Sequence, residues 1–238
     1  MTQLYHVFYR FLDLLFPPRC VNCDTYLNED LALCRNCRAK IVLQKTFFCG
    51  KCRGRIPPGL LRSGCHPYFP YVLGAATDYG EEIPRRLVLA LKFQRIKSAA
   101  RDLASLMEIY LLNSKFSILN SHSVLVPIPL GSRRERERGY NQAELIAKEL
   151  SLEYAIPLVP DALRRIRNTK PQSKLLDHDQ RKANMLGSFT ADPQKLRGVE
   201  NVILVDDVTT SGATFKVAAL AIKAVANVNI IALAAAKA

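Results

Sequence analysis

The cysteines are the feature that most restricts how this chain can fold. All seven lie between positions 20 and 65, and the first six form three C-x2-C pairs separated by ten and eleven residues. Two such pairs direct four thiolates at one point, which completes the tetrahedral shell of a structural zinc ion. Disulfides are the competing interpretation, but seven is odd and the N-terminus is not typical of a signal peptide. The region therefore predicts a small module that folds around metal.

The spacing suggests how the ligands divide between sites. The simplest first site takes the two N-terminal pairs, Cys20, Cys23, Cys34 and Cys37. A second site needs two more ligands beside the third pair, and the candidates together are Cys49, Cys52, Cys65 and His66. A plain surface histidine is the alternative for the last of these. We therefore expect one or two zinc ions in a structural role, because a closed four-ligand shell leaves no open position for catalysis.

The charge of the chain indicates its partners. Its 238 residues carry a formal net charge of +13, while 49% of them are apolar, which is enough for a real core. Such a balance favours polyanionic partners, namely nucleic acid, phosphorylated ligands or an anionic membrane surface. Good solubility is the simpler alternative.

The N-terminal segment predicts a helix rather than a targeting signal. Leu4–Phe16 places apolar residues on most of one helical face and ends at two prolines, while His6, Arg10 and Asp13 interrupt the apolar run. This helix can pack on the main domain, bind a partner or lie on a membrane. No stretch reaches the roughly 18 apolar residues of a membrane-spanning helix. We therefore expect a cytoplasmic protein that does not span the membrane.

After Ala75 the pattern changes to alternating helices and strands. Helices are expected at 83–113 (one or two), 141–150 and 213–225; strands are expected at 123–129, 158–159, 202–205 and 228–234. Asn141 is a plausible helix cap, and the polar, basic stretch 162–188 is expected to begin as a loop. Alternation of this kind predicts a mostly parallel sheet with flanking helices. The predicted domains are an N-terminal helix (1–18), a cysteine-rich module (19–72) and an α/β domain (73–238).

The clearest candidate for a ligand-binding site is the segment 202–214, VILVDDVTTSGAT. A loop between a parallel strand and a helix lies at the carboxyl end of the sheet, where such folds bind ligands. Free amides at the helix start suit a phosphate, Gly212 permits close approach, and small hydroxyl side chains add donors. Asp206 and Asp207 repel a phosphate but suit the diol of a ribose or a magnesium ion. The loop is thus predicted to hold ribose 5-phosphate, and the binding residues together are Asp206, Asp207, Thr209, Thr210, Ser211, Gly212, Ala213 and Thr214.

These residues resemble the phosphoribosyl pyrophosphate (PRPP) motif of type I phosphoribosyltransferases at every defining position. Further segments resemble the ComF family of competence proteins: VPIPLGSRRERERGYNQAELIA, RNTKPQSKLLDHDQRKANMLGSF, LVLALKF and the cysteine-rich N-terminus, which is similar to that family's double zinc ribbon. The motifs agree in order and cover nearly the whole chain. The resemblance implies an α/β type I phosphoribosyltransferase-like fold, with a mostly parallel sheet and an added zinc-ribbon module.

The resemblance also implies a role in natural transformation. Such proteins are thought to handle incoming single-stranded DNA inside the cell, with the DNA-uptake machinery at the inner membrane as a partner and a possible peripheral location there. Two departures from the family pattern stand out. Tyr68 occupies the position of the last ribbon cysteine, and Thr210 stands where some phosphoribosyltransferases carry an acidic base, so a base must come from elsewhere or from the substrate.

Three functions follow as alternatives. An enzyme would use magnesium and PRPP, with Asp206 and Asp207 on the ribose and with Arg134 and Arg138 on the departing pyrophosphate, where charge grows in the transition state. Arg165, Arg167 and Lys170 lie on a basic loop that could close over the site.

A binding protein would instead hold single-stranded DNA without turnover. Its basic side chains would include Lys51, Arg53 and Arg55 on the cysteine-rich module, and stacking would come from Tyr140, Phe47 and Phe48. A solvated turn is the alternative for the charged run 133–138. Nucleotide salvage is the third and weakest candidate, because a salvage enzyme has little need for a zinc ribbon and this charge.

Overall fold

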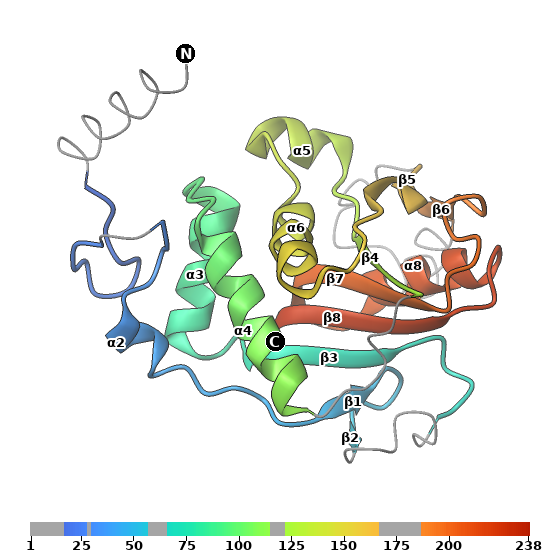
Figure 1. Ribbon diagram of the computed structural model, residues 1–238, viewed down its shortest axis with the longest axis horizontal. Helices are drawn as coiled ribbons and strands as arrows, with labels where there is room; N and C mark the ends of the chain where they lie inside the picture. Colours follow the sequence, from blue (N-terminus) through green and yellow to red (C-terminus); the bar gives the residue numbers. More distant parts are fainter. Residues whose placement is uncertain (1–16, 28–29, 57–65, 115–121, 167–186) are drawn as a thin grey trace, which may run out of the picture.

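The core of the protein is one mixed sheet between two layers. The structure is a computed structural model that describes residues 17–27, 30–56, 66–114, 122–166 and 187–238. Its six-stranded sheet has the order β2-β1-β3-β8-β7-β4 (Figure 1). The strands are β1 (Phe47–Cys49), β2 (Arg55–Ile56), β3 (Val72–Asp78), β4 (Ser123–Pro127), β7 (Asn201–Thr209) and β8 (Asn229–Lys237). The predicted N-terminal helix, Cys65, Arg167 and Lys170 lie outside the described residues.

Four strands of the sheet, β3, β8, β7 and β4, are parallel and buried on both faces. β3 pairs with β8, β8 with β7, and β7 with β4, all in parallel. Side chains alternate along β7: Val202 and Leu204 face one core, whereas Ile203 and Val205 face the other. Each core needs its own covering layer, because parallel sheets rarely leave a face to solvent. The predicted α/β class with a mostly parallel sheet is confirmed.

Helices supply those layers. On one face lie α3 (Glu82–Phe93), α4 (Ala99–Asn113) and α6 (Gln142–Tyr154); on the other lie α8 (Ala213–Lys223) and a small antiparallel pair, β5 (Leu163–Arg165) with β6 (Phe189–Ala191). The helical region 83–113 is thus two helices. Asn141 caps α6 as predicted, since its side chain accepts a hydrogen bond from the amide of Ala143 at 3.1 Å.

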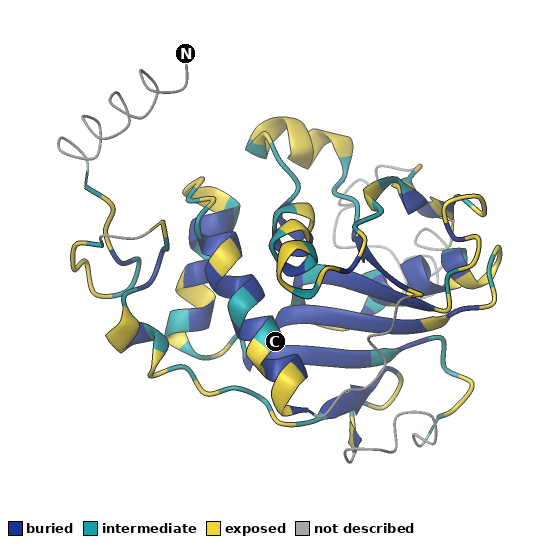
Figure 2. Ribbon diagram, viewed as in Figure 1, coloured by how far each residue is buried: buried dark blue, intermediate teal, exposed yellow. Residues whose placement is uncertain are grey.

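Several elements differ from the sequence-based expectation. β3 was not predicted, because its glycine and alanines give little strand signal. The loop expected after residue 162 begins with β5. The charged run expected as a loop or turn is a short helix, α5 (Ser132–Arg138), with an i,i+4 pair between Arg133 and Glu137 at 2.8 Å. Figure 2 shows that most of α5 is exposed; only Arg138, at its end, is partly buried.

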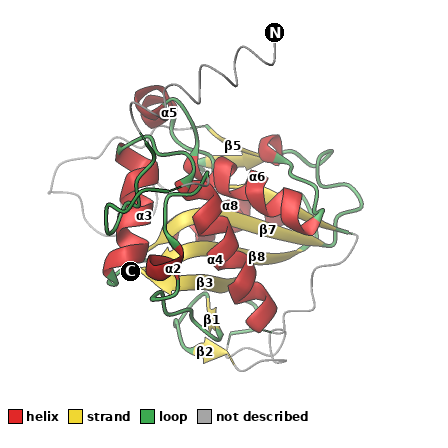
Figure 3. Cartoon of the chain, turned by 60° about the vertical axis from the view of Figure 1, so that its left-hand side comes forward, coloured by secondary structure: helices red, strands yellow, loops and turns green. Residues whose placement is uncertain are grey.

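The cysteine-rich module is continuous with the main sheet. β1 pairs antiparallel with β3 and with β2, so the third cysteine pair sits at the edge of the α/β domain (Figure 3). The division predicted between residues 72 and 73 falls at the start of β3, and hydrogen bonds of one sheet cross it. The three-part division of the chain stays a prediction.

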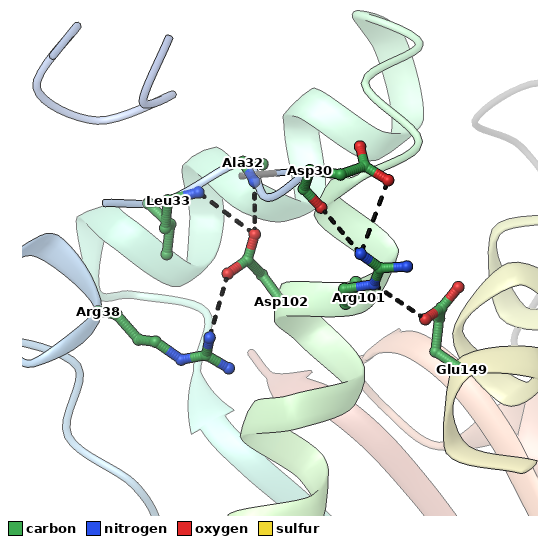
Figure 4. A network of polar contacts seen from close by, with 7 residues as sticks. All are labelled: Asp30, Ala32, Leu33, Arg38, Arg101, Asp102 and Glu149. Atoms are coloured by element: carbon green, nitrogen blue, oxygen red, sulfur yellow. Dashed lines mark hydrogen bonds and ion pairs between the residues drawn. The ribbon is translucent and has the colours of Figure 1, made fainter. Parts of the chain in front are cut away.

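The first half of the module docks on α4 through a buried carboxylate. One oxygen of Asp102 accepts hydrogen bonds from the amides of Ala32 at 2.6 Å and Leu33 at 3.2 Å, and the other lies 3.7 Å from Arg38 (Figure 4). Nearby, Arg101 joins Asp30 and Glu149 by more exposed ion pairs. A charged group anchored by amides of a distant segment fixes how the two segments sit on each other.

Candidate functional site: two metal clusters and a strand-end cleft

Two of the three C-x2-C pairs form matching turns. In each, the amide of the first cysteine donates to a carbonyl five residues ahead, Cys20 to Thr25 and Cys49 to Gly54, both at 2.8 Å. The residue after the second cysteine, Asp24 or Arg53, donates back to the first cysteine's carbonyl at 2.9 Å, with φ of 63° in both cases. Such turns bring both sulfurs to the same side.

The first cluster suits one zinc ion. The sulfurs of Cys20, Cys23, Cys34 and Cys37 all lie within 4.8 Å of one another, and the Cys23 and Cys34 sulfurs are 3.6 Å apart. Tetrahedral Zn–S bonds of about 2.3 Å require sulfurs separated by about 3.8 Å. The donor set therefore fits a closed structural zinc site.

The second cluster brings three predicted ligands together. Cys49, Cys52 and His66 place one ligand atom each within 4.8 Å of the others, and the sulfur of Cys49 lies 3.3 Å from His66 Nδ1. The histidine is thus turned toward the sulfurs. These donors suit zinc, and the proposed further ligand, Cys65, lies outside the described residues.

Two carboxylates and one lysine mark the carboxyl end of β7. Asp207 is buried and its Oδ1 lies 2.9 Å from Lys92 Nζ at the end of α3. Asp206 is half-buried, and its Oδ1 accepts the Asp207 amide at 2.9 Å. Burial and then the neighbouring charge of Asp207 raise the pKa of Asp206 to about 8, against the opposing effects of the hydrogen bond from the Asp207 amide and of Lys92. The surroundings of Asp206 therefore favour a proton or another cation at this carboxyl.

The loop after β7 has the shape expected of an anion site. Gly212 adopts a left-handed φ of 66° and begins α8, while Thr210 and Ser211 are exposed and Thr214 is half-buried. Amides of the first helical turn lack intrahelical partners and carry the positive end of the helix dipole. Thr209 differs, because its side chain is buried and its hydroxyl makes no hydrogen bond among the described residues.

A cationic cleft adjoins the carboxylates. It has a volume of about 610 Å³ and is lined by Tyr79, Lys92, Phe93, Arg95, Arg134, Glu137 and Arg138. The structure thus brings Arg134 and Arg138 of α5 to the same cleft as Lys92, which pairs with Asp207. Burial, and then the charge of Arg134, lowers the pKa of Arg165, so the predicted cation Arg165 lies close enough to Arg134 to be affected by its charge.

The structure corrects one stacking prediction and adds two residues. Phe47 and Phe48 are both buried, so neither ring is available to a nucleobase. Their consecutive positions on β1 place them on opposite faces of the sheet, in the two cores. Lys92 was missed as a site residue, although the LVLALKF segment contained it. Arg53, expected only on a nucleic-acid track, contacts the carbonyl of Thr210 at 3.3 Å.

Fold and clusters together define a class: an α/β protein with a phosphoribosyltransferase-like sheet and an N-terminal zinc-ribbon region. Residues 11–66 match the family model described as a double zinc ribbon domain. The chain is 30% identical to Competence protein F of Haemophilus influenzae over 206 residues, which cover 82% of this chain and 86% of that protein. The chain belongs to the ComF family of competence proteins.

Two further relatives agree with this assignment. Competence protein ComFC of Bacillus subtilis is 40% identical over 102 residues, which cover 42% of this chain and 38% of that protein. DNA utilization protein YhgH of Escherichia coli is 28% identical over 197 residues, covering 82% and 79%. Within the described ranges, no helix is both long and apolar enough to cross a membrane.

Proposed function

We propose that this protein serves DNA uptake or DNA utilisation and binds PRPP with magnesium at the carboxyl end of β7. The names of its relatives support the first part. The second part, PRPP binding, is supported by one arrangement of side chains. A pair of carboxylates and a loop suited to an anion follow the same strand, β7. They lie beside a cleft that is lined by four cationic side chains, Lys92, Arg95, Arg134 and Arg138. Ribose diol, 5-phosphate and pyrophosphate each have a matching partner.

The chain's own groups divide the ligand between them. Amides at the start of α8 and the hydroxyls of Thr210, Ser211 and Thr214 hold the 5-phosphate. Asp206 and Asp207 accept hydrogen bonds from the ribose hydroxyls. Magnesium, when bound, neutralises pyrophosphate oxygens. Arg134 and Arg138 stabilise the pyrophosphate, and because its charge grows if the bond to ribose breaks, the same contacts would favour transfer to an acceptor.

Calorimetric titration of the zinc-loaded protein with PRPP, with and without magnesium, tests this site. We expect magnesium-dependent binding that the double variant D206N/D207N loses. The matched control D161N/D192N makes the same two Asp→Asn changes at residues that do not line the cleft, and it should bind like the wild type. Absence of binding to the wild type, or equal binding by both double variants, would refute the assignment.

Single-stranded DNA is a second candidate ligand of the same cleft. Phe93 supports it: its side chain is 67% exposed, lines the cleft, and lies with its ring 5.2 Å from the guanidinium carbon of Arg138. An exposed aromatic face among cations is the arrangement that stacks bases while neutralising phosphates. The opposite face of the ring is the place for a base, because Arg138 covers one side.

An oligonucleotide titration distinguishes the two ligands. We expect F93A to weaken oligonucleotide binding roughly tenfold, since stacking on an aromatic side chain contributes about 1–3 kcal/mol per base. F93L keeps apolar volume and should recover little. PRPP should compete with the oligonucleotide, and affinity should fall steeply with salt. Salt-insensitive binding, or F93A binding as tightly as the wild type, would exclude this use of the cleft.

A further inference from the structure

The second metal cluster touches the predicted phosphate loop through a single arginine. Arg53 follows Cys52 directly, and the metal-binding turn fixes its backbone: its amide donates to Cys49 at 2.9 Å and its φ is 63°. From there its Nη2 donates to the carbonyl of Thr210 at 3.3 Å, 157 residues away in sequence. The other terminal nitrogen, Nη1, is buried and has no hydrogen-bond partner among the described residues.

A buried tyrosine holds the loop from the same side. Tyr71, which precedes β3, donates its hydroxyl to the carbonyl of Gly212 at 3.1 Å. Its ring packs against Phe69 and Phe215, which leaves it little freedom. A β-carbon on Gly212 would lie 2.5 Å from Arg53 Nη2 and 2.6 Å from the Tyr71 hydroxyl. The loop is therefore fitted against these two side chains at a position where only glycine leaves space.

Arg53 and Tyr71 form a clamp that helps to fix the direction of the loop amides. The Gly212 carbonyl also accepts the Lys216 amide at 2.9 Å as α8 begins, and the Ala213 amide lies 3.4 Å from Ser211 Oγ. In a planar trans peptide the carbonyl of one residue and the N–H of the next point in opposite directions. Thr210 and Gly212 direct their carbonyls at Arg53 and Tyr71, so the amides of Ser211 and Ala213 point away from the clamp. Those two amides belong to the loop that is predicted to receive the 5-phosphate, and a donor already oriented costs less to order on binding.

We propose that metal at the second cluster, Cys49–Cys52–His66, positions the phosphate loop through Arg53. Metal holds the turn, the turn holds Arg53, and Arg53 holds the Thr210 carbonyl. Loss of this metal then lowers affinity for a phosphorylated ligand while the parallel sheet stays folded. The identity of the ligand rests on the proposed function; the coupling between metal and loop does not. Arg53 is on this view a positioning residue.

Four zinc-loaded, full-length proteins test the coupling: wild type, R53Q, R53K and R55Q. R55Q removes the same charge from an exposed position two residues away on the same module. Hydrogen–deuterium exchange of residues 208–216, without ligand, should speed up in R53Q, recover in part in R53K and stay unchanged in R55Q. Affinity for magnesium–PRPP should fall roughly tenfold in R53Q, as expected for one lost hydrogen bond from a charged group.

The metal itself is removed selectively by C52S, with C23S in the first cluster as control. We expect faster exchange over 208–216 in C52S and wild-type exchange there in C23S, with β8 protected in both. If C52S fails to fold, exchange over 208–216 in R53Q, which keeps its full zinc content, still tests the coupling between the metal cluster and the loop. Unchanged exchange in R53Q overturns the inference even if PRPP binds, whereas no PRPP binding with faster exchange in R53Q overturns the proposed function alone.

Discussion

Replacing Asp102 by alanine should be the most damaging single change in the docking of the cysteine-rich module. Its carboxylate is 1% exposed and accepts two amide hydrogen bonds, from Ala32 and Leu33, which are themselves buried. The variant leaves both amides without an acceptor, at about 1–3 kcal/mol each. The variant also removes the ion pair with Arg38 at 3.7 Å. This pair contributes little to stability, because the Arg38 side chain is partly exposed to solvent. We therefore expect a loss of about 2–6 kcal/mol, the combined cost for the two amides.

Urea unfolding of the zinc-loaded protein at pH 7 measures this loss. The control is D30A, because the Asp30 side chain is 82% exposed and its contact with Arg101 at 3.6 Å should contribute less than about 1 kcal/mol. D102N keeps one carbonyl oxygen as an acceptor and should fall between the two. If D102A unfolds within about 0.5 kcal/mol of D30A, the carboxylate does not hold the module on α4 and the reasoning from Figure 4 is wrong.

Three further predictions concern the strand-end site. G212A should destabilise the protein by at least about 1–2 kcal/mol, the cost of a β-carbon in a left-handed conformation. It should also abolish PRPP binding in calorimetry. Wild-type affinity for PRPP in G212A would show that the loop does not need glycine at this position. The pKa of Asp206 is raised from its ordinary 3.8 to about 8, chiefly by burial, so the folded state holds this proton more tightly than the unfolded state and wild-type stability should fall as pH rises from 4 through 8. D206N lacks this titration, so its advantage in thermal unfolding should grow between pH 5 and 9, and a constant difference would refute the shift. K92M leaves Asp207 buried without its 2.9 Å partner and should cost about 1–3 kcal/mol; D207N should restore most of this in a double-mutant cycle, whereas additive losses would mean that the pair is not coupled.

Local patterns predicted the elements whose signal is local. The four apolar residues 202–205 predicted β7, the alanine-rich run predicted α8, and Asn141 was predicted as the cap of α6. The carboxylates and the loop could be assigned to the carboxyl end of the sheet because parallel topology places them there. The two clusters of metal ligands could be predicted from the spacing of the cysteines, because each C-x2-C turn forms within a few residues.

What the sequence did not reveal depends on contacts between distant segments. β3 contains glycine and three small residues, and it is a strand because β8 and β1 flank it. The roles of Lys92, Arg53 and Asp102 arise from partners at least 64 residues away, too far for a local sequence pattern to contain both partners. The adjacent phenylalanines looked like a stacking surface, but alternation along β1 sends both into cores.

The position of β8 has a consequence for the order in which the molecule assembles. β8 lies between β3 and β7, and its register joins Val72 to Ile231, 159 residues later. During synthesis the two sides of the sheet remain unjoined until residues 229–237 have left the ribosome, so the edge of β3 that pairs with β8 stays without its partner strand until then. The first cysteine cluster, complete by residue 37, can close around its metal long before that. Residues 229–237, and not the metal-binding ones, join the two sides of the sheet.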